Sequence, residues 1–128
     1  MRKPGTMPRW VILRHDPPED GSRVLHWDFM LEVGDVLRTW ALATEPRGGV
    51  SISAEALADH RKAYLDYEGP LSQDRGRVTR WDRGTYQEVD ASERRILVIL
   101  DGERLRGATE LIPQGQNPRY WTVTFSAE

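Results

Sequence analysis

Apolar and polar residues alternate along several short segments of the chain, with the two-residue period of strands that bury one face. In the segment 24–33, one face carries the apolar residues Trp27, Phe29, Leu31 and Val33. The other face carries His26, Asp28, Met30 and Glu32, and we expect it to be too polar for a core. The segment 120–125 alternates in the same way. Both segments are predicted to be strands.

Stretches rich in Val, Ile, Trp, Tyr and Thr lie between frequent turn signals such as Gly69-Pro70 and Asp101-Gly102, which favours further strands. We predict strands at 10–14, 24–33, 36–43, 76–81, 94–101, 104–111 and 120–125. The run 96–100 is continuously apolar, which indicates a strand covered on both faces. The segment 53–58 begins with Ser53 and continues with good helix formers, which predicts a short helix that ends between Asp59 and Tyr64.

Short strands at close spacing with one helix predict a mostly β fold. We expect a compact antiparallel β-barrel or sandwich with one short helix. The length of 128 residues corresponds to a single domain, 1–128. Trp27, Trp81 and Trp121 fit the pattern of the core.

Composition and charge exclude several classes of protein. The chain is 38% hydrophobic and 30% charged, and no apolar run approaches the ~20 residues of a membrane span. Its first residues lack the apolar stretch of a secretory signal, so we expect a cytoplasmic protein without a membrane partner. The absence of cysteine excludes disulfides and thiolate chemistry. The formal net charge of −2 argues against a strongly basic nucleic-acid module, but leaves room for a local basic patch.

Each of the three histidines has an aspartate within two residues. In a strand, His26 and Asp28 point to the same face, ~7 Å apart at Cα. His15 would lie beside this pair if the two strands were partners in a hairpin. Imidazole and carboxylate ligands of this kind suit Mn, Fe or Zn. The alternative is a solvated strand face with an ion pair, and His60 equally fits a residue at the C-terminal end of a helix, where the dipole favours it.

A basic cluster follows at 75–83, where four arginines are opposed only by Asp82. If 76–81 is a strand, Arg75, Arg77 and Thr79 share one of its faces. Guanidinium groups bind phosphate oxygens in pairs, so such a cluster beside a metal suits a phosphate-handling site. The alternative is an ordinary charged strand at the surface.

The order of several motifs resembles the 3′-phosphoesterase domain of bacterial DNA ligase D. The similar blocks are Arg14-His15-Asp16, Leu25-His26-Trp27-Asp28-Phe29-Met30-Leu31-Glu32, Arg38-Thr39-Trp40-Ala41, Asp59-His60, Asp66-Tyr67-Glu68-Gly69 and Trp81-Asp82-Arg83-Gly84-Thr85-Tyr86. The resemblance spans most of the chain and implies a Mn²⁺-dependent phosphoesterase that removes a 3′-terminal ribonucleoside or a 3′-phosphate from DNA in end repair. Zn²⁺ and Co²⁺ are further candidates for the metal.

Carried over residue by residue, the resemblance implies that His15, His26 and Asp28 bind the metal. It implies that His60 contacts the scissile phosphate and that Tyr64 lies beside it. A protonated His60 would then stabilise the phosphoryl oxygens or protonate the leaving group.

Three departures from the family pattern bear on activity. Met30 replaces an arginine that would bind phosphate, the segment 51–58 lacks a second functional arginine, and the spacing from His15 to His26 is five residues longer than in the ligase-fused form. We hypothesise that Arg75 and Arg77, with Arg38 or Arg61, take over phosphate binding.

Two other functions stay open. A barrel in which Met30 replaces the arginine of the family pattern would bind DNA ends, or a partner protein, without cleaving them. A further alternative is a non-haem Fe(II) oxygenase that uses His26, Asp28 and His60 as its ligands. For the phosphoesterase we expect a monomer that acts on primer–template 3′ ends, with any repair ligase or polymerase acting in trans.

Overall fold

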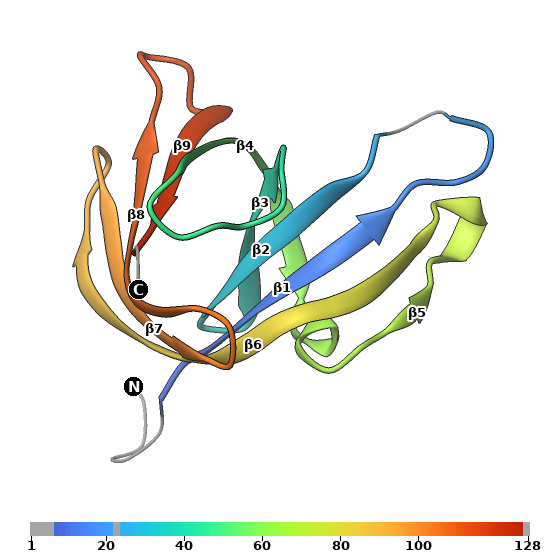
Figure 1. Cartoon of the computed structure of the whole chain (residues 1–128), viewed down its shortest axis with the longest axis horizontal. Helices are drawn as coiled ribbons and strands as arrows, with labels where there is room; N and C mark the ends of the chain where they lie inside the picture. Colours follow the sequence, from blue (N-terminus) through green and yellow to red (C-terminus); the bar gives the residue numbers. More distant parts are fainter. Residues whose placement is uncertain (1–6, 22–23, 127–128) are drawn as a thin grey trace.

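The structure, a computed structural model, describes residues 7–21 and 24–126. Its strands are β1 (Arg9–Asp16), β2 (His26–Val33), β3 (Val36–Leu42), β4 (Ser51–Arg61), β5 (Gly69–Pro70), β6 (Arg77–Ala91), β7 (Ile96–Gly102), β8 (Arg106–Pro113) and β9 (Tyr120–Phe125). Two short 3₁₀ turns, η1 (Lys62–Leu65) and η2 (Ser72–Asp74), lie on either side of β5 (Figure 1). None of the helical segments in the described part of the chain has the length and apolar character needed to cross a membrane.

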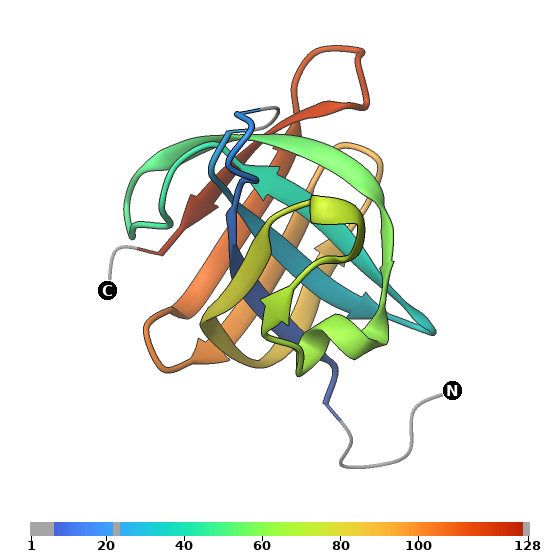
Figure 2. The same cartoon turned by 90° about the vertical axis from the view of Figure 1, so that its right-hand side faces the viewer.

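The strands close into an antiparallel barrel. The order around it is β1-β2-β3-β4-β9-β8-β7-β6, and β6 pairs again with β1 (Figure 2). The strand β5 pairs only with the start of β6, so it lies outside the closed ring. The prediction of a mostly β antiparallel barrel is confirmed.

The barrel interior is filled by large side chains whose alternation was visible in the sequence. Trp27, Phe29 and Leu31 of β2 all point into this core. Trp121 joins it from β9, and Trp81 packs against it while partly exposed. Val33, which was expected on the same face, is exposed because it adjoins the β2–β3 turn.

A second, smaller core lies on the opposite face of β1 and β2, so the prediction that this face is too polar for a core is wrong. Met30 is 1% exposed there. Its partners in this cluster are Val11, Leu13, Leu37, Leu65 and Val78. The cover comes from η1 and the start of β6, segments remote in sequence from β2, and Figure 2 shows this part of the chain in front of the barrel. The sequence around Met30 carries no sign of that cover.

The segment 53–58 is part of strand β4, so the predicted helix is wrong, and with it the interpretation of His60 as a residue at the end of a helix. The strand β4 pairs with β3 on one side and with β9 on the other. Intrinsic helix propensity is a weak preference, and these two ladders of backbone hydrogen bonds override it.

The apolar run in β7 was predicted to be covered on both faces, and this is also wrong. Ile96, Val98 and Leu100 are buried in the barrel core, whereas Ile99 is 36% exposed. A barrel wall has one inner face, and no described layer covers the outside of β7.

The barrel is held together near the β7–β8 turn by the carboxylate of Asp82. This side chain is 4% exposed and accepts hydrogen bonds from the backbone N–H groups of Arg83, Glu103, Arg104 and Leu105 at 2.8–3.0 Å. A Cβ on Gly102 would lie 2.7 Å from Oδ2 of this carboxylate, and one on Gly84 would lie 1.8 Å from the Asp101 carbonyl oxygen. The Trp-Asp-Arg-Gly motif therefore has a structural role in barrel closure.

Candidate metal centre and phosphate site

Two neighbouring strands bring His15, His26 and Asp28 together on the face of the second core. His15 of β1 is the direct Cα partner of His26 in β2, and Asp28 follows two residues later on the same face. One potential ligand atom from each residue lies within 4.8 Å of the other two. The hairpin pairing on which the sequence-based prediction depended is thus present.

Backbone carbonyls fix the orientation of both imidazole rings. The Nε2 atom of His15 lies 2.8 Å from the carbonyl oxygen of Arg75, and the Nδ1 atom of His26 lies 3.1 Å from that of Val24. Because a carbonyl only accepts hydrogen bonds, each of these nitrogens carries its ring's proton in the neutral state. The other nitrogens, Nδ1 of His15 and Nε2 of His26, then present lone pairs toward Asp28.

The carboxylate of Asp28 meets both of these nitrogens. Its Oδ2 lies 3.3 Å from His15 Nδ1, and its Oδ1 lies 3.1 Å from His26 Nε2. Within the described ranges, Oδ1 is buried and accepts no hydrogen bond. Two imidazole lone pairs and a carboxylate facing one another repel unless a cation lies among them or the rings take up further protons. This donor set fits a divalent metal ion that accepts nitrogen and oxygen ligands.

Charge favours the same conclusion. Burial raises the pKa of Asp28, but hydrogen bonds and attraction from His15 and His26, which act when the nitrogens facing Asp28 carry protons, outweigh this effect and hold its pKa below the ordinary value of 3.8. The carboxylate is therefore ionised at neutral pH, with only 3% of the residue exposed. An ionised carboxylate in so buried a place requires a positive partner.

His60 and Tyr64 line the same small cavity as the candidate metal ligands, and this cavity has a volume of about 100 Å³. His60, near the end of β4, is paired with Leu37 of the second core. Its Nδ1 lies 2.9 Å from the Ala58 carbonyl oxygen, so its Nε2 carries the lone pair of the neutral ring. The ring of Tyr64 packs edge-on against that of His60, with centroids 5.6 Å apart.

The turn η1 is fixed relative to β2 by a buried anchor. The Nζ of Lys62 lies 2.8 Å from Oε2 of Glu32, a residue that is 9% exposed. The other oxygen of Glu32 accepts a hydrogen bond from the backbone N–H of Arg9. Glu32 therefore connects η1, which carries Tyr64, to the two strands that carry the candidate metal ligands.

The remaining wall of the cavity is apolar, and it includes Met30, the position at which the resemblance implied an arginine. Met30 lines it together with Leu57, Leu71 and Val78. Of the predicted phosphate-binding residues, Arg75 lines this cavity and also an adjoining pocket of about 460 Å³. Arg61 lines the adjoining pocket as well.

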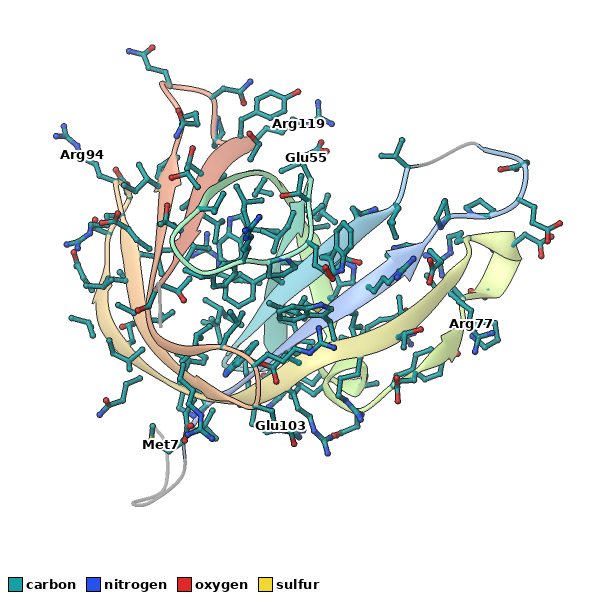
Figure 3. The ribbon with its side chains drawn as sticks, viewed as in Figure 1. Met7, Glu55, Arg77, Arg94, Glu103 and Arg119 are labelled. Atoms are coloured by element: carbon teal, nitrogen blue, oxygen red, sulfur yellow. The ribbon has the colours of Figure 1, made fainter. Side chains whose placement is uncertain are left out.

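The structure places the other two arginines elsewhere. Val78 faces the cavity, so Arg77, its neighbour along β6, points to the opposite face and is exposed beside β5 (Figure 3). The guanidinium of Arg38 lies over the ring of Trp40, 4.9 Å from its centroid. The predicted group of four therefore divides into two residues near the cavity and two that face away from it.

Sequence reasoning missed four contributors to the site. Leu57 was assigned to a helix, and the carbonyls of Val24 and Arg75 are backbone groups that residue identity does not reveal. Tyr67 lines the 460 Å³ pocket beside Tyr64, and its hydroxyl donates a hydrogen bond to the carbonyl of Pro70. The block Asp66-Tyr67-Glu68-Gly69 was the one available signal for Tyr67.

Comparison with known proteins agrees with this geometry. Residues 15–113 match the family described as DNA Ligase D 3′-phosphoesterase domain. The chain is 34% identical over 114 residues to the multifunctional non-homologous end joining protein LigD of Pseudomonas aeruginosa, an alignment of 81% of this chain and 13% of that protein. It is 32% identical over 103 residues to the corresponding LigD of Mycobacterium tuberculosis, which covers 73% of this chain and 14% of that protein.

The matched region includes every candidate metal ligand as well as His60, Tyr64 and Arg75. It corresponds to about one seventh of each of these relatives, so the match concerns one domain of a larger protein. This chain belongs to the DNA ligase D 3′-phosphoesterase domain family.

Proposed function

We propose that this domain is a metal-dependent phosphoesterase that acts on 3′ ends of DNA in end repair. It removes a 3′-phosphate, a 3′-terminal ribonucleoside, or both, and uses Mn²⁺, with Zn²⁺ or Co²⁺ as further candidates. The observation that carries the proposal is the convergence of one ligand atom each from His15, His26 and Asp28 within 4.8 Å of one another, in a cavity that His60 also lines.

Two neutral imidazoles and one carboxylate would hold the metal. A divalent ion with this ligand set keeps a net charge of +1 and, when bound, polarises a phosphoryl oxygen and lowers the pKa of a coordinated water. His15 and His26 would keep their orientation because Arg75 and Val24 supply carbonyls to their other nitrogens. The apolar wall formed by Met30, Leu57 and Val78 limits the entry of bulk water.

His60 would serve the phosphate rather than the metal. Its ring is held through Nδ1, which leaves Nε2 to donate a proton to a phosphoryl oxygen or to the leaving group when the ring is charged. Tyr64 restricts the rotation of that ring by packing against its edge. We therefore assign His60 as the catalytic acid and Tyr64 as its neighbour at the phosphate.

Arg75 and Arg61 would bind the phosphates of the DNA strand next to the cleaved bond. Both line the 460 Å³ pocket, which adjoins the metal cavity and has no acidic residue among its described lining. The relatives are named as end-joining proteins, so a ligase and a polymerase that act on the same DNA ends are the proposed partners.

The test is conversion of a primer–template with a 3′-phosphate to a 3′-hydroxyl, with and without Mn²⁺. We expect turnover in the wild type, loss of turnover in His26→Ala and Asp28→Asn, and unchanged turnover in Asp35→Asn, an exposed carboxylate in the β2–β3 turn. Mn²⁺ titration by calorimetry shows whether each loss follows from lost metal binding. Equal turnover in Asp28→Asn and Asp35→Asn contradicts the proposal.

The replacement of the family arginine by buried Met30 favours one second candidate, a domain that binds DNA ends or a partner protein without cleaving them. Tight binding of 3′-phosphate DNA in the presence of Mn²⁺, with no product even at high enzyme concentration, would establish that function instead.

A further inference from the structure

A pocket of about 610 Å³ adjoins the metal cavity on the side away from the arginines. The two hollows share His26 and Leu57 as lining residues. The volume lies in the range of about 300–1,000 Å³ typical of small-molecule sites. No part of the phosphate chemistry described above uses this pocket.

A row of cross-strand neighbours leads from the candidate metal ligand Asp28 into the pocket, which its other three members line. Asp28, Ala41, Glu55 and Tyr120 are successive Cα partners across β2, β3, β4 and β9. Direct partners point to the same face, and three strand spacings separate the ends of the row by about 14 Å. Tyr120, 49% exposed, thus lies at the end of the row farthest from Asp28, and the space between the two is long enough for a nucleoside.

Small side chains create this gap. Ala41, Ala43 and Ser53 line the pocket between His26 and Tyr120. Ala41 lies in β3 and Ser53 in β4, where such small residues are less common than β-branched ones, and local exceptions to strand preference tend to occur at functional sites. The composition that made 53–58 resemble a helix therefore belongs to a stretch of barrel wall that borders a pocket.

The pockets on the two sides of the metal centre differ in charge. On the arginine side, Arg61 and Arg75 are the charged residues among the described lining. On the other side, the charged residue among the described lining is Glu55, whose Oε2 lies 2.8 Å from Nε of Arg119 (both are labelled in Figure 3). Polyanionic DNA is attracted to the first pocket, whereas an uncharged group with an aromatic face and hydroxyls suits the second.

We propose that the 610 Å³ pocket binds the nucleoside that leaves the 3′ end, with its base against the ring of Tyr120. This inference rests on the proposed function and assigns the direction of the substrate: the retained strand lies over Arg61 and Arg75, and the leaving nucleoside lies over Ala41. Hydrolysis joins a water oxygen to phosphorus and breaks the bond to the 5′-oxygen of that nucleoside. The 5′-oxygen departs with a proton, and the strand keeps a 3′-phosphate.

A 3′-phosphate substrate has no nucleoside beyond its phosphorus, so the two activities depend differently on the pocket. The two activities are measured on the same duplex sequence, which ends either in a 3′-terminal ribonucleoside or in a 3′-phosphate. Tyr120→Ala should lower the rate of nucleoside removal about tenfold more than the rate of phosphate removal, because base–aromatic stacking is lost. Tyr120→Phe keeps the ring and should restore the ratio. Ala41→Leu, which fills part of the pocket, should change the ratio in the same direction, whereas Ala108→Leu at an exposed site on β8 should not. Equal losses in both activities, or none, would overturn the proposal.

Binding gives a second readout that does not require turnover. A duplex ending in 2-aminopurine riboside, with a methylene group in place of the 5′-oxygen of that residue, cannot be hydrolysed at the terminal bond. We expect its fluorescence to be quenched on binding to the wild type in Mn²⁺ and to stay unquenched with Tyr120→Ala. Quenching that is the same in both proteins contradicts the assignment. If the wild type processes neither substrate, the proposed function fails, while the fluorescence still tests the pocket.

Discussion

The Nε2 atom of His15 lies 2.8 Å from the backbone carbonyl oxygen of Arg75, a residue 60 positions later in the chain. This hydrogen bond connects the first candidate metal ligand to the segment that carries the candidate phosphate-binding arginine. The next residue, Gly76, has a φ of +94°, and a Cβ there would lie 2.0 Å from the carbonyl oxygen of Asp16. The backbone at 75–76 is thus pressed against the end of β1.

Gly76→Ala should weaken metal binding although it removes no ligand. The added methyl must push the backbone away from Asp16, and the Arg75 carbonyl would then no longer orient the His15 ring. Loss of such an outer partner typically lowers metal affinity by about 10- to 100-fold. Calorimetric titration with Mn²⁺ measures the change. Gly115→Ala is the control, since its φ of +56° carries similar strain but the space around it is open. Equal affinities of the two variants would contradict the expectation.

Arg75→Gln and Arg61→Gln should raise KM for 3′-phosphate DNA, and the double variant should raise it further. A charged hydrogen bond to phosphate contributes about 1.5–3 kcal/mol, which corresponds to roughly 10- to 100-fold. Arg77→Gln is the matched control, because its side chain points to the opposite face of β6. Steady-state kinetics at two salt concentrations separates a local contact from general attraction. A larger effect of Arg77→Gln than of Arg75→Gln would mean that the substrate follows another path.

His60→Ala should abolish most turnover while leaving Mn²⁺ affinity nearly unchanged. His60 lines the cavity from β4, and the clustered ligand atoms come from His15, His26 and Asp28. Loss of a general acid typically costs about 10²- to 10⁴-fold in rate. Paired measurements of kcat and of Mn²⁺ binding test the assignment. If the variant loses metal and activity together, His60 is a ligand.

Asp82→Ala should destabilise the barrel strongly. Four backbone N–H groups donate to this buried carboxylate, and its removal leaves them without their acceptor. We expect the free energy of unfolding to fall by about 3 kcal/mol or more. Asp101→Ala is the control, because that side chain is 76% exposed and lies 3.9 Å from Arg106, a surface pair worth under about 0.5 kcal/mol. Urea denaturation of both variants gives the comparison, and similar midpoints would rule out the anchoring role.

Asp66 should contribute a small, pH-dependent part of the stability. A hydrogen bond from Arg9, with Nη2 2.7 Å from Oδ1, lowers the pKa of Asp66 below its ordinary value of 3.8. A lowered pKa in the folded state stabilises the fold above the unfolded pKa, and this stability is lost as the pH falls through the folded value. Because Asp66 is 62% exposed, Asp66→Asn should cost only a few tenths of a kcal/mol at pH 7. Urea midpoints of the two proteins should converge at low pH, and a constant difference across the range would exclude this cause.

The sequence predicted the features of the barrel that depend on local alternation. The inward residues of β2 and the bounds of β9 follow from a period of two. The pairing of His15 with His26 was expected only on the condition that β1 and β2 form a hairpin, and they do. The burial of Met30 was not predictable, because Leu65 and Val78 arrive from distant segments to cover it. Met30 therefore lies in a hydrophobic core although its neighbours in the sequence on the same strand face, Asp28 and Glu32, are polar.

In the candidate site, too, some features could be predicted from the sequence and others depend on the fold. The pair His26 and Asp28 was recognisable by type and spacing, whereas His60 was assigned through the family resemblance alone. The orientation of the histidine rings depends on backbone carbonyls at Val24, Ala58 and Arg75, which every residue possesses. Among the arginines, Arg77 could be placed on the face of β6 opposite the cavity only once the register of β6 with β1 was known.

The hydrogen bonds of Asp82 have a consequence for the comparison of related sequences. Trp81-Asp82-Arg83-Gly84 is the block of the chain that resembles the family most closely, yet the Asp82 carboxylate is used to hold the β7–β8 turn against the barrel. Selection for a closed barrel would preserve this block in a relative that had lost all ability to bind metal. Whether such a relative is an enzyme has to be judged at His15, His26, Asp28 and His60, where folding alone imposes a weaker constraint.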